Sequence, residues 1–217
     1  EGYLRNAEAF RNYLSYSGLD TILQAGEHEI SASLTPIEIA KVLQDPTPAR
    51  VTLTILAGWR MEEITASLPG SGLNFTPDEF LRMVQNPPTQ LNLPDDLPAG
   101  ASLEGFLFPD SYTIERRMGI VEYLSLILDN FEVQVTPALR QAFNGQGLSL
   151  FEAVILASIV EREAMLDEEM PEIASVFYNR LAAGMKLDTD PTVQYAVGYN
   201  ATQKTWWTNP LSVTNLQ

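Results

Sequence analysis

The carboxylates of this chain are its main candidates for proton-transfer chemistry. The 217 residues include no cysteine and one histidine, His28. This composition excludes disulfides, thiolate nucleophiles, cysteine-ligated zinc and a two-histidine zinc site within one chain, and only His28 could complete a Ser-His-Asp triad. Acid–base catalysis by side chains therefore falls mainly to Asp and Glu, with Tyr and Lys as lesser candidates.

Glu161 is the carboxylate in the most informative setting. It follows an almost entirely apolar run, Ala153 to Val160, and at helical spacing it shares a face with Val154 and Met165. We therefore expect it at the edge of the core or of a cleft. Partial burial disfavours the charged form of a carboxyl group, so a glutamate in such a place can keep a proton to donate near neutral pH. The residues alone leave a second interpretation open, in which the last helical turn emerges into water and Glu161 pairs with an arginine.

Three other segments combine polar and aromatic residues. Leu103–Tyr112 contains Glu104 and aromatic residues around a glycine turn, which suits either the face of a sugar or a strand edge packed on the core. Asn179 offers a polar contact on a helix whose other side is apolar. Asp188–Thr192, with Asp190, could be a carboxylate metal site or an Asx or proline turn, and no spacing typical of metal ligands favours the metal.

The helices and the strand that must position these residues can be predicted from sequence patterns, and together they indicate an α+β fold. Residues 50–56 alternate branched apolar residues with threonine, which indicates a strand, and the Pro-rich residues 85–103 indicate a loop. Residues 199–217 have no clear period, so we expect a loop poorly tied to the domain, in which Trp206 and Trp207 either stack on sugar rings or pin the loop to the core. Amphipathic patterns and capping residues predict helices at about 6–16, 35–43, 61–68, 76–84, 119–131, 136–143, 149–165 and 171–183.

The net charge and the composition of the chain limit the classes of partner that it can bind. The formal net charge is −15 and no basic stripe is visible, so nucleic acid is not an expected partner, nor is an anionic membrane surface bound through charge. With 45% hydrophobic residues the chain can build a core. Its longest strongly apolar run, Ala153 to Val160, is far shorter than the roughly 20 residues that span a bilayer.

A series of motifs in this order resembles the endolytic murein transglycosylase family (MltG, also called YceG-like). The series begins with a Glu-Gly-hydrophobic-Pro-Asp-Tyr segment at 103–112 and extends through four further blocks. These are Ala157-Ser158-Ile159-Val160-Glu161-Arg162-Glu163, Val176-Phe177-Tyr178-Asn179-Arg180-Leu181, Gly184-Met185 and Thr189-Asp190-Pro191-Thr192-Val193.

The resemblance implies a fold, an activity and a set of site residues. It implies a small LysM-like α/β region at residues 1–90 and a mainly helical catalytic domain at 91–217. Glu161 matches the catalytic glutamate, a general acid and base that cleaves the bond between N-acetylmuramic acid and N-acetylglucosamine and leaves 1,6-anhydro ends, with no metal or cofactor. Glu104, Glu163, Asn179 and Asp190 match motif positions that we expect to contact substrate.

The resemblance also implies partners and a location. The substrate would be peptidoglycan glycan strands, and the cell-wall synthesis machinery would be a further partner. We expect the natural protein to be held in the cell membrane by a single N-terminal transmembrane helix that is absent here, with this part on the extracytoplasmic side.

This chain departs from the family pattern at two points. It has Ala57-Gly58-Trp59 where members commonly have Glu-Gly-Trp, so any role of that glutamate is missing or filled elsewhere. It ends at Gln217, where the family continues into a segment near the active site, so the catalytic domain is expected to be incomplete at its C-terminal end.

Two other functions compete with the transglycosylase. One is a non-catalytic LysM-like scaffold that binds peptidoglycan without cutting it, for which a carboxylate at the end of an apolar helix has no use. The other is a hydrolase that pairs Glu161 with Glu104 or Asp190, since hydrolytic glycosidases usually employ two carboxylates. Its products would carry reducing ends.

Overall fold

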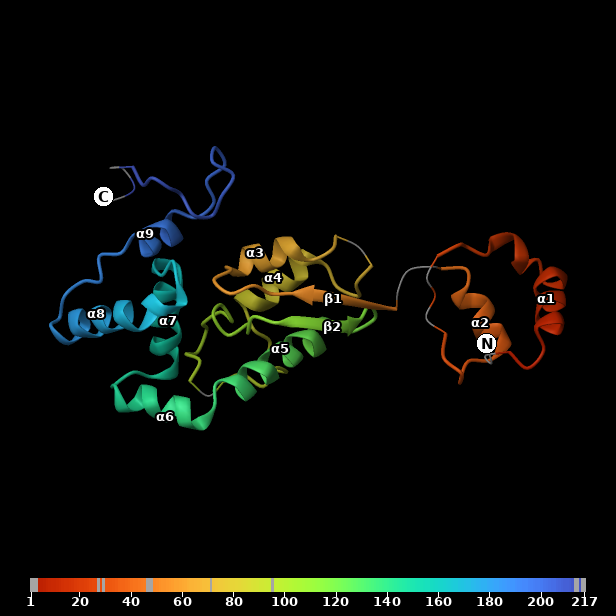
Figure 1. Cartoon of the computed structure of the whole chain (residues 1–217), viewed down its shortest axis with the longest axis horizontal. Helices are drawn as coiled ribbons and strands as arrows, with labels where there is room; N and C mark the ends of the chain where they lie inside the picture. Colours follow the sequence, from red (N-terminus) through yellow and green to blue (C-terminus); the bar gives the residue numbers. More distant parts are fainter. Residues whose placement is uncertain are drawn as a thin grey trace.

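The computed structural model describes residues 4–26, 28, 30–45, 49–70, 72–94, 96–212 and 215. Within them the fold is α+β, as predicted, with many helices and one small antiparallel sheet (Figure 1). The elements in chain order are α1 (Ala7–Tyr16), the 3₁₀ helix η1 (Leu19–Ile22), α2 (Pro36–Val42), β1 (Arg50–Thr54), α3 (Met61–Ser67), α4 (Pro77–Gln85), β2 (Ser111–Glu115), α5 (Ile120–Gln134), α6 (Pro137–Gly145), α7 (Leu150–Glu163), the 3₁₀ helix η2 (Asp167–Glu169), α8 (Met170–Ala182) and α9 (Asp190–Val197).

The predicted helices are all present, with ends within three residues of the expected positions. Side-chain caps explain this accuracy, because they fix helix starts locally. Thr35, Thr76 and Ser149 each accept a hydrogen bond from the amide three residues later, and the glutamate at that position bonds back to the capping residue. Four elements were not predicted: β2, α9 and the two 3₁₀ helices η1 and η2.

The N-terminal helices have a hydrophobic cluster of their own. Phe10 and Leu14 of α1 pack with Ile39 and Ala40 of α2, and Figure 1 shows these helices at one end of the chain. The described residues up to 45 form helices only, so β1, α3 and α4 make the one strand–helix–helix unit within the described residues of the first 90. The LysM-like assignment of residues 1–90 remains a prediction.

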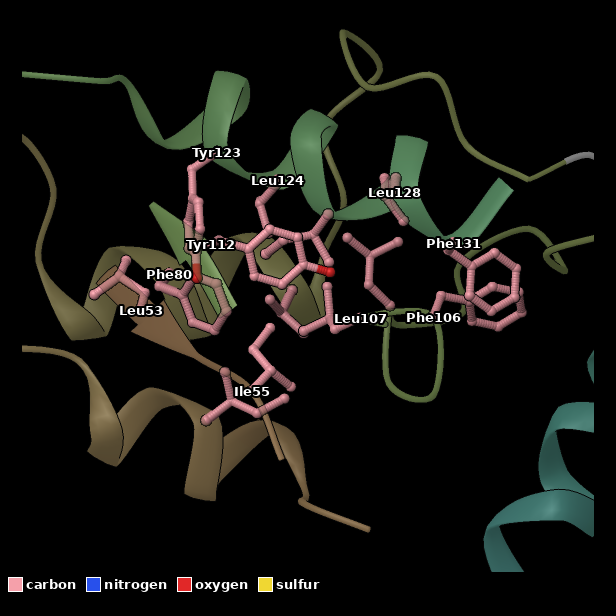
Figure 2. Packing of buried hydrophobic residues seen from close by; sticks show 14 of the residues in the cluster. Leu53, Ile55, Phe80, Phe106, Leu107, Tyr112, Tyr123, Leu124, Leu128 and Phe131 are labelled. Carbon is pink, nitrogen blue, oxygen red and sulfur yellow. The ribbon is translucent and has the colours of Figure 1, made fainter. Parts of the chain in front are cut away.

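The main core surrounds the sheet. β1 pairs with β2 in the register Leu53 opposite Tyr112, so the sheet joins residues on either side of position 90. Helices α3, α4 and α5 cover it with buried side chains, several of them drawn in Figure 2. Tyr123 of α5 is fully buried, with its ring edge-on to Tyr112. The helix α7 packs against this core through Val154.

Helix α7 connects that core to the C-terminal helices. Val154 packs on the main core, whereas Leu156 and Val160 form a separate cluster with Phe177 of α8. The turn before β2 approaches α7 so closely that a Cβ at Gly105 would lie 2.6 Å from Cγ1 of Val154. One face of α7 is therefore held against the central core.

The lengths and hydropathies of the helices also bear on membrane insertion. Among the described residues, no single helix is long and apolar enough to cross a membrane. Within that part of the chain, α6 and α7 satisfy both criteria only when taken together, and they are bent by 87° relative to each other.

Candidate active site

Glu161 lies on the last turn of α7, against the turn that leads from β1 to α3. Its side chain is half-buried, and its Cγ is 3.5 Å from the position that a Cβ on Gly58 would occupy. Val154, one heptad earlier, meets the neighbouring turn at Gly105, so the face predicted to carry Glu161 does lie against the central core. No described residue forms an ion pair with Glu161, which is the pairing that the alternative interpretation required.

The turn beneath Glu161 favours a glycine at position 58 because of its backbone conformation. The φ of Gly58 is +72°, in the left-handed region that other L-residues adopt only at a cost. The atoms nearest to a methyl group added at this position would be those of Glu161 and Arg162, at 3.5 to 3.8 Å, which is ordinary van der Waals contact. The glycine thus shapes the turn, and two consecutive side chains of α7 extend over it.

Glu104 approaches the same segment from the turn before β2. Its carboxyl group is half-buried beside the Met61 amide and the Tyr195 hydroxyl, and its Oε2 atom is fully buried without a hydrogen-bond partner among the described residues. Burial raises the pKa of Glu104, and the negative charge of Glu62 raises it further, against the opposing effects of Tyr195, Met61 and Arg60. Glu104 is therefore more readily protonated than an exposed glutamate.

Tyr195 of α9 shares this environment with Glu104. Its burial raises the pKa of Tyr195 to about 12, and the negative charge of Glu104 contributes in the same direction. The phenol therefore stays protonated at neutral pH and can donate a hydrogen bond to Glu104. Through this pair α9 is joined to the turn before β2.

A buried arginine that the sequence analysis did not identify organises the centre of the site. Arg60 is only 6% exposed, and its guanidinium carbon lies 4.1 Å from the ring centroid of Tyr195, 4.8 Å from that of Trp206 and 5.8 Å from that of Trp207. Its Nε donates to Glu62 at 3.2 Å and its Nη1 to the Tyr195 carbonyl at 2.9 Å. A single arginine in the otherwise mostly apolar segment 55–61 was the signal available in the sequence.

The expectation that residues 199–217 are poorly tied to the domain is wrong for the segment around Trp207. The indole N–H of Trp207 donates to Oε2 of Glu63 at 3.2 Å. Thr208 is buried, and its carbonyl accepts a hydrogen bond from Gln194 at 3.0 Å. Among its described residues, 199–212 and 215, the segment lacks a regular helix or strand beyond one bridge between Asn200 and Thr205, as predicted, but specific side chains hold it. Of the two roles considered for the tryptophans, pinning the loop is the one that the contacts support.

The other predicted site residues lie at different distances from Glu161. Glu163 accepts a hydrogen bond from the buried hydroxyl of Thr189, which ties the end of α7 to the start of α9. Asp190 follows Thr189 and is exposed. It is the first residue of helix α9, so this segment is not merely the Asx or proline turn considered above. Asn179 is exposed beside residues 146–148, which precede α7, so it lies near the opposite end of that helix, roughly 17 Å along its axis from Glu161.

The arrangement of acidic side chains also bears on metal binding. Within the part of the chain that the structure describes, no three histidine or acidic side chains are grouped so that they could hold a metal ion.

Comparisons with known proteins agree with one another on the family. The sequence model of the YceG-like family matches residues 1–215. The endolytic murein transglycosylase of Streptococcus pneumoniae is 30% identical over 219 residues, which cover 91% of this chain and 39% of that protein. The protein of the same name from Bacillus subtilis is 25% identical over 206 residues, covering 90% of this chain and 57% of that protein. This chain therefore spans less than two thirds of the length of both relatives.

One solved structure is similar over the whole chain. A crystal structure of a yceG-like protein from Listeria monocytogenes aligns with a TM-score of 0.66 at 26% identity. The alignment covers 100% of this chain and 72% of that one.

Proposed function

Because the chain belongs to the YceG-like family, we propose that it is part of an endolytic lytic transglycosylase of peptidoglycan. The bond cleaved would be the one between N-acetylmuramic acid and N-acetylglucosamine, within glycan strands. The relatives named endolytic murein transglycosylase support this substrate and this class of reaction. Murein lies outside the cytoplasmic membrane, so we propose that the chain acts there. An N-terminal transmembrane anchor, a LysM-like region at residues 1–90, a catalytic domain at 91–217 and partners in wall synthesis belong to the same proposal.

The setting of Glu161 is the observation that carries the proposal. The carboxyl group is half-buried at the end of an apolar helix, next to the turn at Gly58, and without an ion-pair partner among the described residues. A general acid needs a carboxyl group that substrate can reach and that is not already committed to an ion pair. Glu161 lies at the partly exposed edge of the core, whereas Glu104 packs against Met61 and Tyr195 with its Oε2 atom fully buried.

Glu161 would perform both proton transfers. Its protonated carboxyl group donates to the glycosidic oxygen as the bond to the muramyl C1 breaks. The resulting carboxylate then accepts the proton of the muramyl C6 hydroxyl as that oxygen attacks C1, which closes the 1,6-anhydro ring. The glutamate ends protonated, as it began, and no water enters the product.

The remaining predicted residues have supporting roles in this proposal. Glu104 and Glu163 each join α9 to another part of the site, through Tyr195 and Thr189 respectively. Asp190 is exposed and directly follows Thr189, and its contact with a bound strand is part of this proposal. The position of Asn179, near the other end of α7, gives no support to a contact with the sugar at Glu161.

The test is the Glu161→Gln variant, which keeps the shape of the side chain and removes its titrating proton. We expect cleavage of purified glycan strands to fall by about 10²–10⁴-fold, the usual effect of losing a general acid–base group. Glu168→Gln, at an exposed position on η2, is the matched control and should cleave normally.

Mass spectrometry of the products separates the competing functions. Anhydro-muramyl ends, lighter by one water than reducing ends, support the transglycosylase, and reducing ends in fresh digests support the hydrolase. Binding without cleavage by the unsubstituted chain supports the scaffold. Full activity of Glu161→Gln at an unchanged melting temperature would contradict the assignment of Glu161.

A further inference from the structure

Arg162, the residue after Glu161, is stacked on an aromatic ring and has no hydrogen-bond or ion-pair partner among the described residues. Its guanidinium carbon is 3.8 Å from the ring centroid of Trp207. Its Cδ and Nη1 are 3.7 and 3.8 Å from the position of a Cβ on Gly58, so the side chain extends across that turn. Glu161 extends over the same glycine. The guanidinium and the candidate acid are therefore neighbours on one small surface.

The hydrogen-bonding edge of this guanidinium is unused. A guanidinium stacked on an aromatic ring occupies one face, and its five N–H donors point outward in the plane of the group. In the described part of the chain, Arg162 has neither an ion-pair partner nor a hydrogen-bond acceptor. Arg60, which lies over the ring of Tyr195, is the opposite case, because it is buried and donates to Glu62 and to the Tyr195 carbonyl.

The support beneath Arg162 is rigid. Trp207 donates its indole N–H to Oε2 of Glu63 at 3.2 Å, and the same oxygen accepts the Arg60 amide at 3.1 Å. These bonds fix the indole to the first turn of α3. A guanidinium held on such a platform loses little conformational entropy when it binds a ligand.

Because the chain is strongly acidic, an unpaired arginine next to Glu161 is a suitable binding site for an anionic group. The formal net charge is −15, so an anionic substrate is repelled by most of the surface and needs a local cation. Peptidoglycan strands carry carboxylates on the stem peptide and, where the peptide has been removed, on the lactyl group of the muramyl sugar. A planar fork of N–H donors matches a carboxylate in two parallel hydrogen bonds.

We propose that Arg162, stacked on Trp207, binds a carboxylate of the peptidoglycan strand and so brings a muramyl residue to Glu161. This inference deepens the proposed function and rests on its substrate. Since N-acetylmuramic acid differs from N-acetylglucosamine in bearing the lactyl group, such a contact would also select which of the two sugars lies at the acid. Arg162 would thus be a specificity-determining residue.

The experiment measures binding to three glycans of equal length by tryptophan fluorescence and calorimetry. They are strands with stem peptides, strands stripped by an amidase so that the lactyl carboxylates are free, and chitin oligomers, which carry no carboxylate. The binding measurements use the Glu161→Gln chain to limit turnover. The variants are Arg162→Gln, Arg162→Lys and the control Arg117→Gln, which removes the same charge from an exposed arginine.

We expect Arg162→Gln to weaken binding of a carboxylate-bearing glycan on the order of tenfold to a hundredfold, the usual range for a hydrogen bond to a charged group. Binding of chitin should not change, Arg162→Lys should fall in between, and Arg117→Gln should bind normally. A loss only with stripped strands identifies the lactyl carboxylate as the group bound, and a loss only with peptide-bearing strands identifies a stem-peptide carboxylate. A loss with both shows that Arg162 binds either carboxylate.

Three results would overturn the inference: an equal loss with chitin, no loss with any ligand, or no binding of any glycan by the Glu161→Gln chain that still carries Arg162. Melting temperatures of the variants separate lost binding from lost folding, and Arg162→Lys keeps the test open if Arg162→Gln unfolds. Failure of the catalytic proposal looks different, because it appears as cleavage by Glu161→Gln while the dependence of binding on Arg162 persists.

Discussion

Replacing Gly105 with alanine should destabilise the chain by two separate effects. The backbone at Gly105 has a φ of +83°, which costs an L-residue about 1–2 kcal/mol. The new Cβ would also lie 2.6 Å from Cγ1 of Val154, a distance that forces the turn or α7 to move. Overpacking of this kind typically costs about 1–3 kcal/mol. The two effects together predict a loss of about 2–5 kcal/mol of unfolding free energy.

Denaturant unfolding of four variants separates the two effects: Gly105→Ala, Gly100→Ala, Val154→Ala and the Gly105→Ala, Val154→Ala double variant. Gly100→Ala is the matched control, because its φ is +81° and no atom lies within 4 Å of the new Cβ. It should lose only the backbone part, about 1–2 kcal/mol. In the Gly105→Ala, Val154→Ala double variant the clashing methyl is gone, so the two substitutions should be less than additive. Equal losses at positions 100 and 105, with additive effects at 105 and 154, would refute the close approach of this turn to α7.

Two further predictions concern the groups around Glu104 and Trp207. Burial raises the pKa of Glu104. The contribution of Glu104 to folding stability is therefore complete below the ordinary carboxyl pKa and is lost as the pH rises through the raised pKa. Glu104→Gln should therefore gain melting temperature relative to the parent chain between acidic and neutral pH; a constant difference across that range would contradict the raised pKa. Trp207→Phe keeps most of the ring but removes the hydrogen bond to Glu63, which should lower the unfolding free energy by about 1 kcal/mol. Denaturant titration measures this loss, and a stability equal to that of the parent would show that the bond contributes nothing.

Much of the local structure could be predicted from the sequence, because the information that fixes it is local. Ser149 and Glu152 mark the start of α7 three residues apart, and the apolar run that follows sets its length. The helical period then puts Val154 and Glu161 on one face, and the structure has both against the central core. The resemblance that singled out Glu161 also depends on residues adjacent along the chain.

Only the tertiary structure could decide which distant residues meet. β2 was not predicted because its pairing with β1 joins positions about 60 residues apart, and nothing in the segment 111–115 alone specifies that partner. The same reason applies to the cluster of arginine and aromatic side chains formed by Arg60, Arg162, Tyr195 and Trp207. These residues come from four separate parts of the sequence. Each of these side chains is ordinary in its own segment. Their roles arise from long-range packing, which places one guanidinium inside the cluster with its donors used and leaves the other at its surface with its donors free.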